Sequence, residues 1–276
     1  AIESFKNAML DNIGYAPNDI IGDGNLHRVK DNNGKLNGAY VLHLDSRAAG
    51  YFECFKQNIK QSWKADSKFQ PLSTLQRRTF AIDRQRQKAE RNAEEATKHK
   101  VAADKARYIW HRSTPATAHP YLNKKRVKTH GLRVGRNNTL IVPIYDETKT
   151  LVNLQFISET GGKRFLSGGR KKGCFSVIGK PGELIQICEG MATGASLYES
   201  TGHFTVVALD AGNLEPVAIV IRKFYPDSQI VICGDSDLSG VGQKAAKAAA
   251  LAVGGKYILP AIVGCDWNDV LSMKAV

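Results

Sequence analysis

Residues 184–201 read LIQICEGMATGASLYEST, and residues 229–240 read QIVICGDSDLSG. Each segment begins with a short apolar run, and glycine and acidic residues follow it directly. Similar apolar runs occupy 204–209 and 256–259, and helix-like segments separate all four. Continuous apolar strands that alternate with helices are typical of a parallel sheet covered by helices on both faces. The C-terminal part of the chain is therefore predicted to be an α/β domain with a parallel sheet and flanking helices.

Acidic residues follow three of the predicted strands. Glu189 comes directly after the first strand, Asp235 and Asp237 follow the third, and Asp266 and Asp269 follow the last. Open parallel sheets bind ligands beyond the carboxyl ends of their strands, so we expect these side chains to share one crevice. Asp235 and Asp237 are two residues apart and would face the same way in an extended segment. Clustered carboxylates repel one another, and oxygen-only ligands favour Mg²⁺ or Mn²⁺ over zinc as the ion that offsets this repulsion.

The rest of the chain divides by composition into three further parts. Residues 1–70 are predicted to form a small α+β unit, because one helical segment precedes short strands separated by Asn and Gly turns. Residues 71–112 form a basic helical connector without internal Gly or Pro from residue 72 on. Residues 113–182 form a basic α+β subdomain with a hairpin at 140–158, and 183–276 form the predicted catalytic domain.

Positive charge is concentrated in the middle of the chain. Of the formal net charge of +13, residues 77–136 carry 17 Lys and Arg against 5 Asp and Glu, a net of +12. Residues 183–276 carry 6 basic against 10 acidic residues, a net of −4. This pattern favours a polyanion-binding surface beside a cation-binding pocket, although a solvated charged helix has the same composition.

Residues 161–173 form a second basic segment, which is rich in glycine. Glycines let a backbone approach a ligand closely, and five cations here suit phosphate groups, although a mobile surface loop has a similar composition. The cations are Lys163, Arg164, Arg170, Lys171 and Lys172.

Several classes of protein are disfavoured by what the sequence lacks. It has no apolar run of the roughly 18 residues that a membrane helix needs and no export signal at its start. Its five cysteines are too widely spaced for a zinc ribbon or a dense disulfide framework. Cys188 and Cys233 end apolar strands and are expected to be buried, so we expect a reducing, cytoplasmic compartment.

Three motifs together resemble the TOPRIM domain. They are EGMAT at 189–193, GDSDLSG at 234–240 and DWND at 266–269. TOPRIM domains occur in bacterial primases, topoisomerases, certain nucleases and recombination proteins, and the similarity is strongest to primases of conjugative plasmids and phages. The resemblance implies metal binding and acid–base chemistry for Glu189, and metal binding for Asp235 and Asp237.

The sequence departs from the replicative primases in two places. Those enzymes have an aspartate four residues after the glutamate, where this chain has Thr193. The number of metal ions therefore stays open, and Asp266 or Asp269 is expected to compensate. Replicative primases also carry an N-terminal zinc ribbon, for which this chain has no ligand set. Start-site selection is expected to work differently, through the first 70 residues.

The resemblance implies a DNA primase that makes short RNA primers from NTPs on single-stranded DNA during plasmid or phage replication. Lys163 and Arg164, together with Arg170, Lys171 and Lys172, would contact the nucleotide, and a replicative helicase or a C-terminal helicase domain would be a partner. Two alternatives stay open: a TOPRIM-type metal-dependent nuclease and a non-catalytic nucleic-acid-binding module. The central basic stretch would track the template backbone through Arg77, Arg78, Arg84, Lys124, Lys125, Arg126 and Lys128.

Overall fold

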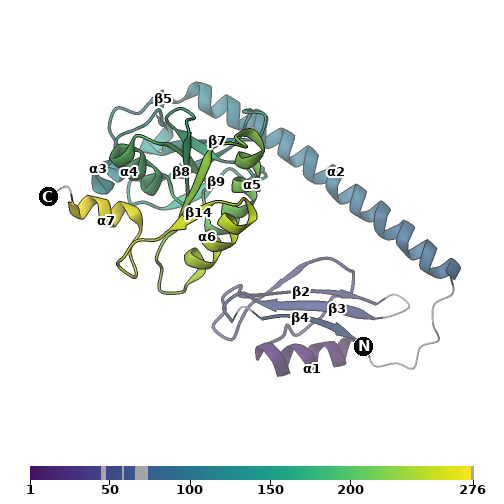
Figure 1. The fold of residues 1–276 in the computed structure, drawn as a ribbon. Helices are drawn as coiled ribbons and strands as arrows, with labels where there is room; N and C mark the ends of the chain where they lie inside the picture. The colour runs from purple at the N-terminus through teal and green to yellow at the C-terminus, as the bar shows by residue number, and fades with distance from the viewer. Residues whose placement is uncertain (45–47, 58, 66–73, 275–276) are drawn as a thin grey trace. The chain divides into compact units, whose positions relative to one another are not determined.

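The computed structural model describes residues 1–44, 48–57, 59–65 and 74–274, apart from the side chains of residues 74, 76, 77, 80 and 274. The chain divides into two compact units, Ala1–Ala81 and Ile82–Val276 (Figure 1). Each unit has its own hydrophobic core. The predicted domain boundaries at residues 70, 112 and 182 stay predictions.

The first unit is one helix packed on an antiparallel sheet. Helix α1 (Ile2–Ile13) buries Phe5, Met9 and Ile13, which recur every four residues and so share one face. That face packs on Tyr40 and Phe52 of the sheet. The four strands lie in the order β1 (His27–Val29), β2 (Gly38–His43), β3 (Ala49–Cys54) and β4 (Ile59–Lys64).

Strand β4 was missed by the sequence analysis. Its sequence IKQSWK is mostly polar, and none of its residues is fully buried. It pairs with β3 along its whole length, and its half-buried Ile59 and Trp63 pack against the core, with the Trp63 ring centre 5.2 Å from that of Phe5. An exposed edge strand of this kind gives little hydrophobic periodicity to detect.

Helix α2 spans Thr74–Arg112, which confirms the prediction of one long helix. Its first half is almost entirely exposed, as expected for a helix rich in Arg, Lys and Glu. Its C-terminal part packs on a sheet of the second unit through Ala106, Ile109 and Trp110. Ala102 and Ala106 are buried, and their small side chains let the helix approach the sheet closely.

The sheet beneath α2 is antiparallel and confirms the predicted hairpin at 140–158. Its order is β5 (Thr114–Pro115), β6 (Arg133–Val134), β7 (Leu140–Tyr145), β8 (Leu151–Ile157) and β9 (Lys163–Phe165). The short helix α3 (Pro120–Lys125) lies between β5 and β6, and its first turn is capped by the His119 ring, which accepts from the Tyr121 amide. A 3₁₀ turn, η1 (Arg136–Asn138), leads into β7.

The third sheet confirms the predicted α/β architecture. Its order is β10 (Ser176–Ile178), β12 (Phe204–Val207), β11 (Leu184–Cys188), β13 (Gln229–Cys233) and β14 (Lys256–Ile258). Strands β11 to β14 run parallel, whereas β10 joins antiparallel to β12. Strand β10 comes from the segment that precedes the predicted catalytic domain, so the sheet is completed from outside residues 183–276.

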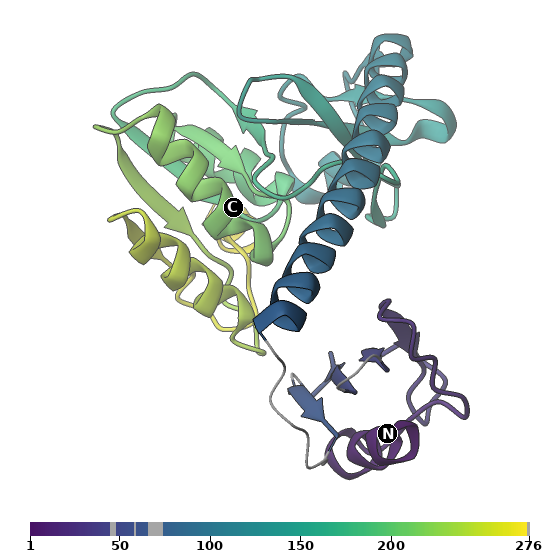
Figure 2. The same ribbon diagram turned by 90° about the vertical axis from the view of Figure 1, so that its right-hand side faces the viewer.

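Helices cover both faces of this sheet (Figures 1 and 2). Helices α5 (Leu214–Phe224) and α6 (Val241–Ala252) pack on one face with Ile185, Ile187 and Ile232. Helices α4 (Met191–Thr201) and α7 (Trp267–Lys274) lie on the other, next to Cys188 and Cys233. The turn η2 (Ala211–Asn213) precedes α5. Within the described ranges, no helix combines the length and apolarity needed to cross a membrane.

Candidate active site

The carboxyl ends of β11, β12 and β13 meet at one edge of the sheet. Cys188, the last residue of β11, is in register with Val207 of β12 and Cys233 of β13. The residues that follow these strands therefore leave the sheet side by side. Glu189 follows β11 and Asp235 follows β13, as the sequence predicted.

A cavity of about 290 Å³ opens at this edge of the sheet. Three of its lining residues are the acidic Glu189, Asp235 and Asp266, which come from three separate segments. Three others are basic, so carboxylates and ammonium groups face the same space. The cavity is lined by Tyr121, Lys124, Lys125, Thr160, Gly161, Lys163, Glu189, Gly190, Ala192, Thr193, Leu209, Asp235 and Asp266.

Burial and mutual repulsion perturb the carboxylates of the cavity. The pKa of Asp235 is raised to about 7, first by burial and then by the charges of Glu189 and Asp266, against the opposing effect of Lys163. The pKa of Glu189 is also raised, by burial and by the charge of Asp210. The Oδ1 atom of Asp235 is buried and receives no hydrogen bond from any described residue. Such an oxygen lacks the partner that a buried acceptor normally has.

Asp237 does not line the cavity. Its Oδ2 accepts a hydrogen bond from the Gly242 amide at 2.7 Å, and its Oδ1 accepts from the Ser239 hydroxyl. These bonds lower the pKa of Asp237 and stabilise the start of α6. A Cβ at Gly242 would lie 2.8 Å from Asp237 Oδ2, so glycine is needed where the helix meets the acidic loop. Asp235 and Asp237 therefore have different hydrogen-bond partners, although the charge of Asp237 still contributes to the raised pKa of Asp235.

The Asp266–Asp269 pair caps helix α7. The Asp269 amide donates to Asp266 Oδ1 at 2.9 Å, and the Asp266 amide donates to Asp269 Oδ2 at 3.2 Å. This reciprocal arrangement is that of a capping box. The Lys125 ammonium lies 3.6 Å from Asp266 Oδ2 and 3.4 Å from Asp269 Oδ1. Asp266 also reaches the cavity, whereas Asp269 lines a neighbouring depression.

The five predicted acidic residues are thus divided by the structure. Glu189, Asp235 and Asp266 line the cavity, and Asp266 also caps α7 together with Asp269. Asp237 does not line the cavity, but its charge contributes to the raised pKa of Glu189 and of Asp235. Among the described residues, no three His, Cys, Asp or Glu side chains form a ready-made metal cluster.

Lys163 and Arg164 lie on opposite faces of strand β9. Lys163 lines the acidic cavity, and its ammonium lies 6.0 Å from the centre of the Tyr121 ring. Arg164 stacks over Phe156, with Cζ 5.0 Å from the ring centre, and lines a different groove. Adjacent residues of a strand point to opposite faces, so the two cannot contact one phosphate group together.

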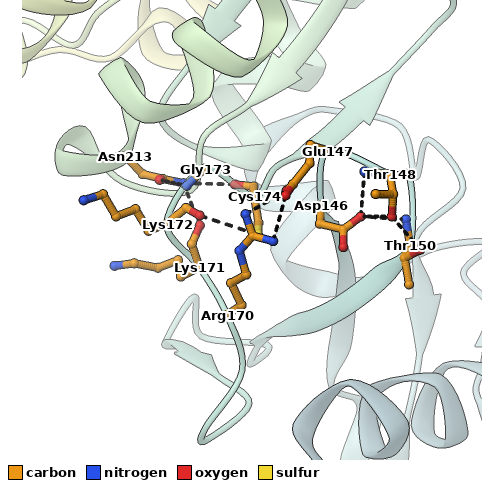
Figure 3. Close-up of polar contacts among 10 residues, drawn as sticks. All are labelled: Asp146, Glu147, Thr148, Thr150, Arg170, Lys171, Lys172, Gly173, Cys174 and Asn213. Atoms are coloured by element: carbon orange, nitrogen blue, oxygen red, sulfur yellow. Dashed lines mark hydrogen bonds and ion pairs between the residues drawn. The ribbon is translucent and has the colours of Figure 1, made fainter. Parts of the chain in front are cut away.

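The cations at 170–172 have different environments (Figure 3). The Arg170 guanidinium forms a two-bond ion pair with Glu147, at 2.7 and 3.2 Å. The Lys171 ammonium lies 2.5 Å from Asp210 Oδ2, and Lys172 is exposed. Arg170 therefore ties the segment to the β7–β8 hairpin, and Lys171 ties it to the loop after β12.

Asn213 fastens this basic segment to the sheet. Its buried side-chain amide accepts from the Gly173 backbone N–H at 2.8 Å and donates to the carbonyls of Cys174 and Ala208 (Figure 3 draws it with Gly173 and Cys174).

The sequence analysis missed Asp210, whose charge raises the pKa of Glu189. It follows β12 as Glu189 follows β11, so the same strand-end rule would have found it.

The predicted DNA-binding residues are also separated by the structure. Lys124 and Lys125 line the acidic cavity. Arg78 and Arg84 are exposed on α2, and the Arg77 side chain lies outside the described residues. The two remaining residues lie near the end of α3, where Arg126 donates to the Ser272 carbonyl at 3.4 Å and the exposed Lys128 donates its backbone N–H to Glu199.

Residues 184–275 match the Toprim domain family, and they contain the sheet edge that carries Glu189 and Asp235. This part of the chain is a Toprim domain. The EGMAT, GDSDLSG and DWND motifs, which suggested the family, all lie inside the matched residues.

The similarity to one group of proteins extends beyond the Toprim domain. Two proteins described as DNA primase TraC, both from Escherichia coli, are 35% identical to this chain over 258 and 262 residues. Each alignment covers 87% of this chain, which spans 24% and 18% of the two relatives. Among solved structures, the primase fragment of the bacteriophage T7 primase-helicase protein matches with a TM-score of 0.45 and 16% identity, covering 60% of this chain and 76% of that one.

Proposed function

We propose that the chain catalyses template-directed synthesis of RNA primers on single-stranded DNA, as part of plasmid or phage replication. The observation that carries the proposal is the shared cavity, where Glu189 and Asp235 face Lys163, Lys124 and Lys125. Similarity to DNA primase TraC over most of the chain supports it. A replicative helicase, or a helicase domain in a longer protein, remains the proposed partner.

A divalent cation, Mg²⁺ or Mn²⁺, fits the carboxylates of the cavity. A divalent cation held by these carboxylates would give Asp235 Oδ1 a partner and would offset the mutual repulsion of Glu189 and Asp235. Mg²⁺ in proteins usually takes one or two carboxylates and completes its shell with water and substrate phosphate. We propose Glu189 and Asp235 as its ligands and Asp266 as a third acidic neighbour. Asp237 and Asp269 would act by holding α6 and α7.

Primer extension joins a 3′-hydroxyl to the α-phosphorus of an NTP and releases pyrophosphate. A bound divalent ion would supply charge stabilisation for the attacking and leaving oxygens. We propose Glu189 as the group that accepts the hydroxyl proton, and the raised pKa that burial and the charge of Asp210 give this carboxyl supports that role. Lys163, Lys124 and Lys125 would neutralise the charge of the triphosphate. Of the five cations at 163–172 that were predicted to contact the nucleotide, Lys163 alone is among the described residues that line this cavity.

An activity assay separates this function from the two alternatives. The protein is incubated with single-stranded DNA, labelled NTPs and Mg²⁺ or Mn²⁺. Short RNA products support the primase, shortened DNA supports a nuclease, and binding without either supports a non-catalytic module.

Two variants and a matched control complete the assay. Glu189→Gln and Asp235→Asn are expected to lower primer synthesis by about a hundredfold or more, because each removes one carboxylate of the cavity. Glu215→Gln, which removes an exposed carboxylate at the start of α5, should retain activity. Full activity of both cavity variants would contradict the assignment.

A further inference from the structure

Strand β14 lies at one edge of the Toprim sheet. It pairs with β13 through Lys256, Tyr257 and Ile258, and no other described strand pairs with it. The backbone N–H and C=O groups on its outer side therefore have no strand partner. All three residues of β14 are exposed. The sheet consequently presents an open row of hydrogen-bonding groups at this edge.

The other edge strands of the described sheets are better protected. Strand β4 carries the exposed cations Lys60 and Lys64, and β5 contains Pro115. Strands β1 and β9 are short and basic, and β10 lies against β7. Charged residues and proline are common means of keeping a sheet edge from pairing with another chain. Strand β14 has one cation, Lys256, followed by two apolar residues, so its edge is the more open to pairing.

Exposed apolar side chains continue along the chain from β14. Tyr257 is 44% exposed, and Ile258 is 39% exposed. Ile262 and Val263, in the loop that follows, are also exposed. Adjacent residues of a strand point to opposite faces, so Tyr257 and Ile258 offer apolar contacts on both faces of the edge. An added strand would therefore find side-chain contacts as well as main-chain partners.

The surface beside β14 is positively charged. Helix α6 contacts β14 (Figure 1) and carries the exposed Lys244 and Lys247. Among the described residues, neither these lysines nor Lys256 has an ion-pair partner. Helix α6 contains no acidic residue, and neither does the segment 256–265. The charge of this edge therefore favours a partner with acidic side chains.

A second copy of the chain fits this edge less well. Antiparallel pairing of β14 with the β14 of another copy would place both α6 helices on the same face of the joined sheet, close to the two-fold axis. Lys244 and Lys247 of the two copies would then face one another, and like charges repel.

We propose that the free edge of β14 binds an extended segment of a partner protein with alternating apolar and acidic residues. The segment would add a strand to the Toprim sheet and pack its apolar side chains on Tyr257 and Ile258. In this mode of recognition, main-chain hydrogen bonds give affinity and alternate side chains give specificity. None of the three residues of β14 lines the acidic cavity, so the proposal is independent of primer synthesis.

Peptide binding to the full chain tests the proposal. The probe is a fluorescein-labelled peptide of alternating valine and glutamate, followed by fluorescence anisotropy. We expect a Kd of about 1 mM or lower, and about tenfold or more weaker binding when lysine replaces glutamate. Methylation of all backbone nitrogens of the probe should abolish binding, because it removes the donors of the ladder. Equal binding of the three peptides, or no binding of the acidic one, would overturn the proposal.

A pair of matched variants tests the apolar contacts. Tyr257→Ser/Ile258→Ser should lower the affinity for the acidic peptide about tenfold or more. The control is Ile219→Ser/Phe224→Ser, which changes side chains of similar exposure, 37% and 46%, on helix α5. It should bind the peptide like the wild type. An equal loss in both variants, or no loss in the first, would overturn the proposal.

A second pair of variants tests the charge. Lys244→Gln/Lys256→Gln should lower the preference for glutamate over lysine in the peptide by about threefold or more. The control Lys180→Gln/Lys223→Gln removes two exposed lysines outside α6 and β14 and should keep that preference. An unchanged preference in the first variant would contradict the assignment of an acidic partner.

Hydrogen exchange on the wild-type protein keeps the test independent of variant folding. Saturating acidic peptide should slow amide exchange within residues 256–259, and protection confined to other segments would overturn the proposal. Two results would assign the edge to another occupant and so overturn it as well. One is a wild-type dimer in sedimentation that Tyr257→Ser/Ile258→Ser abolishes, and the other is protection of 256–259 by oligothymidylate but not by the acidic peptide.

Discussion

At the scale of single residues, position along the chain predicted which acids line the cavity. Glu189 and Asp235 each follow a buried strand, and parallel strands deliver such residues to one edge. Asp237, Asp266 and Asp269 follow the same rule, yet they also cap helices. The sequence could not separate the two uses, because the Asp-x-x-Asp spacing before a helix suits a capping box as well as a ligand pair.

The charge state of Asp235 gives a prediction for stability. Its pKa in the folded protein, about 7, exceeds its ordinary value of 3.8, so the folded state binds more protons between these values and stability falls as pH rises. Asn cannot ionise. In the absence of metal, we therefore expect the free energy of unfolding of Asp235→Asn to increase relative to that of the wild type as pH rises. The increase between about pH 5 and about pH 8 should be roughly 2 kcal/mol, after discounting for partial exposure. Urea unfolding at both pH values measures this.

The matched variant for this measurement is Asp227→Asn, which removes an exposed carboxylate from the loop before β13. If the free energy of unfolding at high pH increased equally in both variants, the effect would come from the overall net charge. The account of Asp235 would then be wrong.

At the scale of elements, the long helix was predictable because it lacks Gly and Pro and is rich in helix-forming residues. The alternating strands were predictable because each is a short continuous apolar run. Strand β9 was not, because it has only three residues inside a glycine-rich basic segment. The family resemblance had assigned Lys163 and Arg164 together to the nucleotide. In the structure, β9 pairs with β8, and this pairing sends the two side chains to different faces.

The attachment of the basic segment to the sheet depends on Asn213. Asn213→Ala would leave the Gly173 amide and the carbonyls of Lys171, Cys174 and Ala208 without this partner. The free energy of unfolding should fall by about 3 kcal/mol, since each unsatisfied buried group costs about 1–3 kcal/mol. Denaturant unfolding measures this effect.

Asn123→Ala is the control for this variant, since Asn123 is exposed on α3 and its removal should change stability by less than about 0.5 kcal/mol. If Asn213→Ala were as stable as this control, the segment would not be fastened as described.

At the scale of the whole molecule, composition separated a basic centre from an acidic C-terminal part. It could not show that Lys124, Lys125 and Lys163 enter the acidic cavity, because that depends on how the two sheets of the second unit pack. Nor could it show that β10 completes the Toprim sheet, since antiparallel pairing of three residues has no local sequence pattern.

Two separate cores predict two separable unfolding transitions. Phe52 belongs to the core of residues 1–81, and Ile232 belongs to a core of the larger unit. Phe52→Ala and Ile232→Ala should each lower the free energy of unfolding of their own unit by about 2–5 kcal/mol. In calorimetry, each variant should therefore lower the midpoint temperature of a different transition. One transition that both variants lower equally would contradict independent units.

The central claim is that Glu189 and Asp235 jointly hold a divalent ion beside the lysines of the cavity. The most direct measurement is anomalous diffraction from crystals soaked with Mn²⁺ and a non-hydrolysable NTP. We expect a manganese peak about 2 Å from a carboxylate oxygen of each residue, with the triphosphate near Lys163. Manganese bound solely at Asp237, Asp266 or Asp269, or a triphosphate bound without metal at Glu189 and Asp235, would contradict the account.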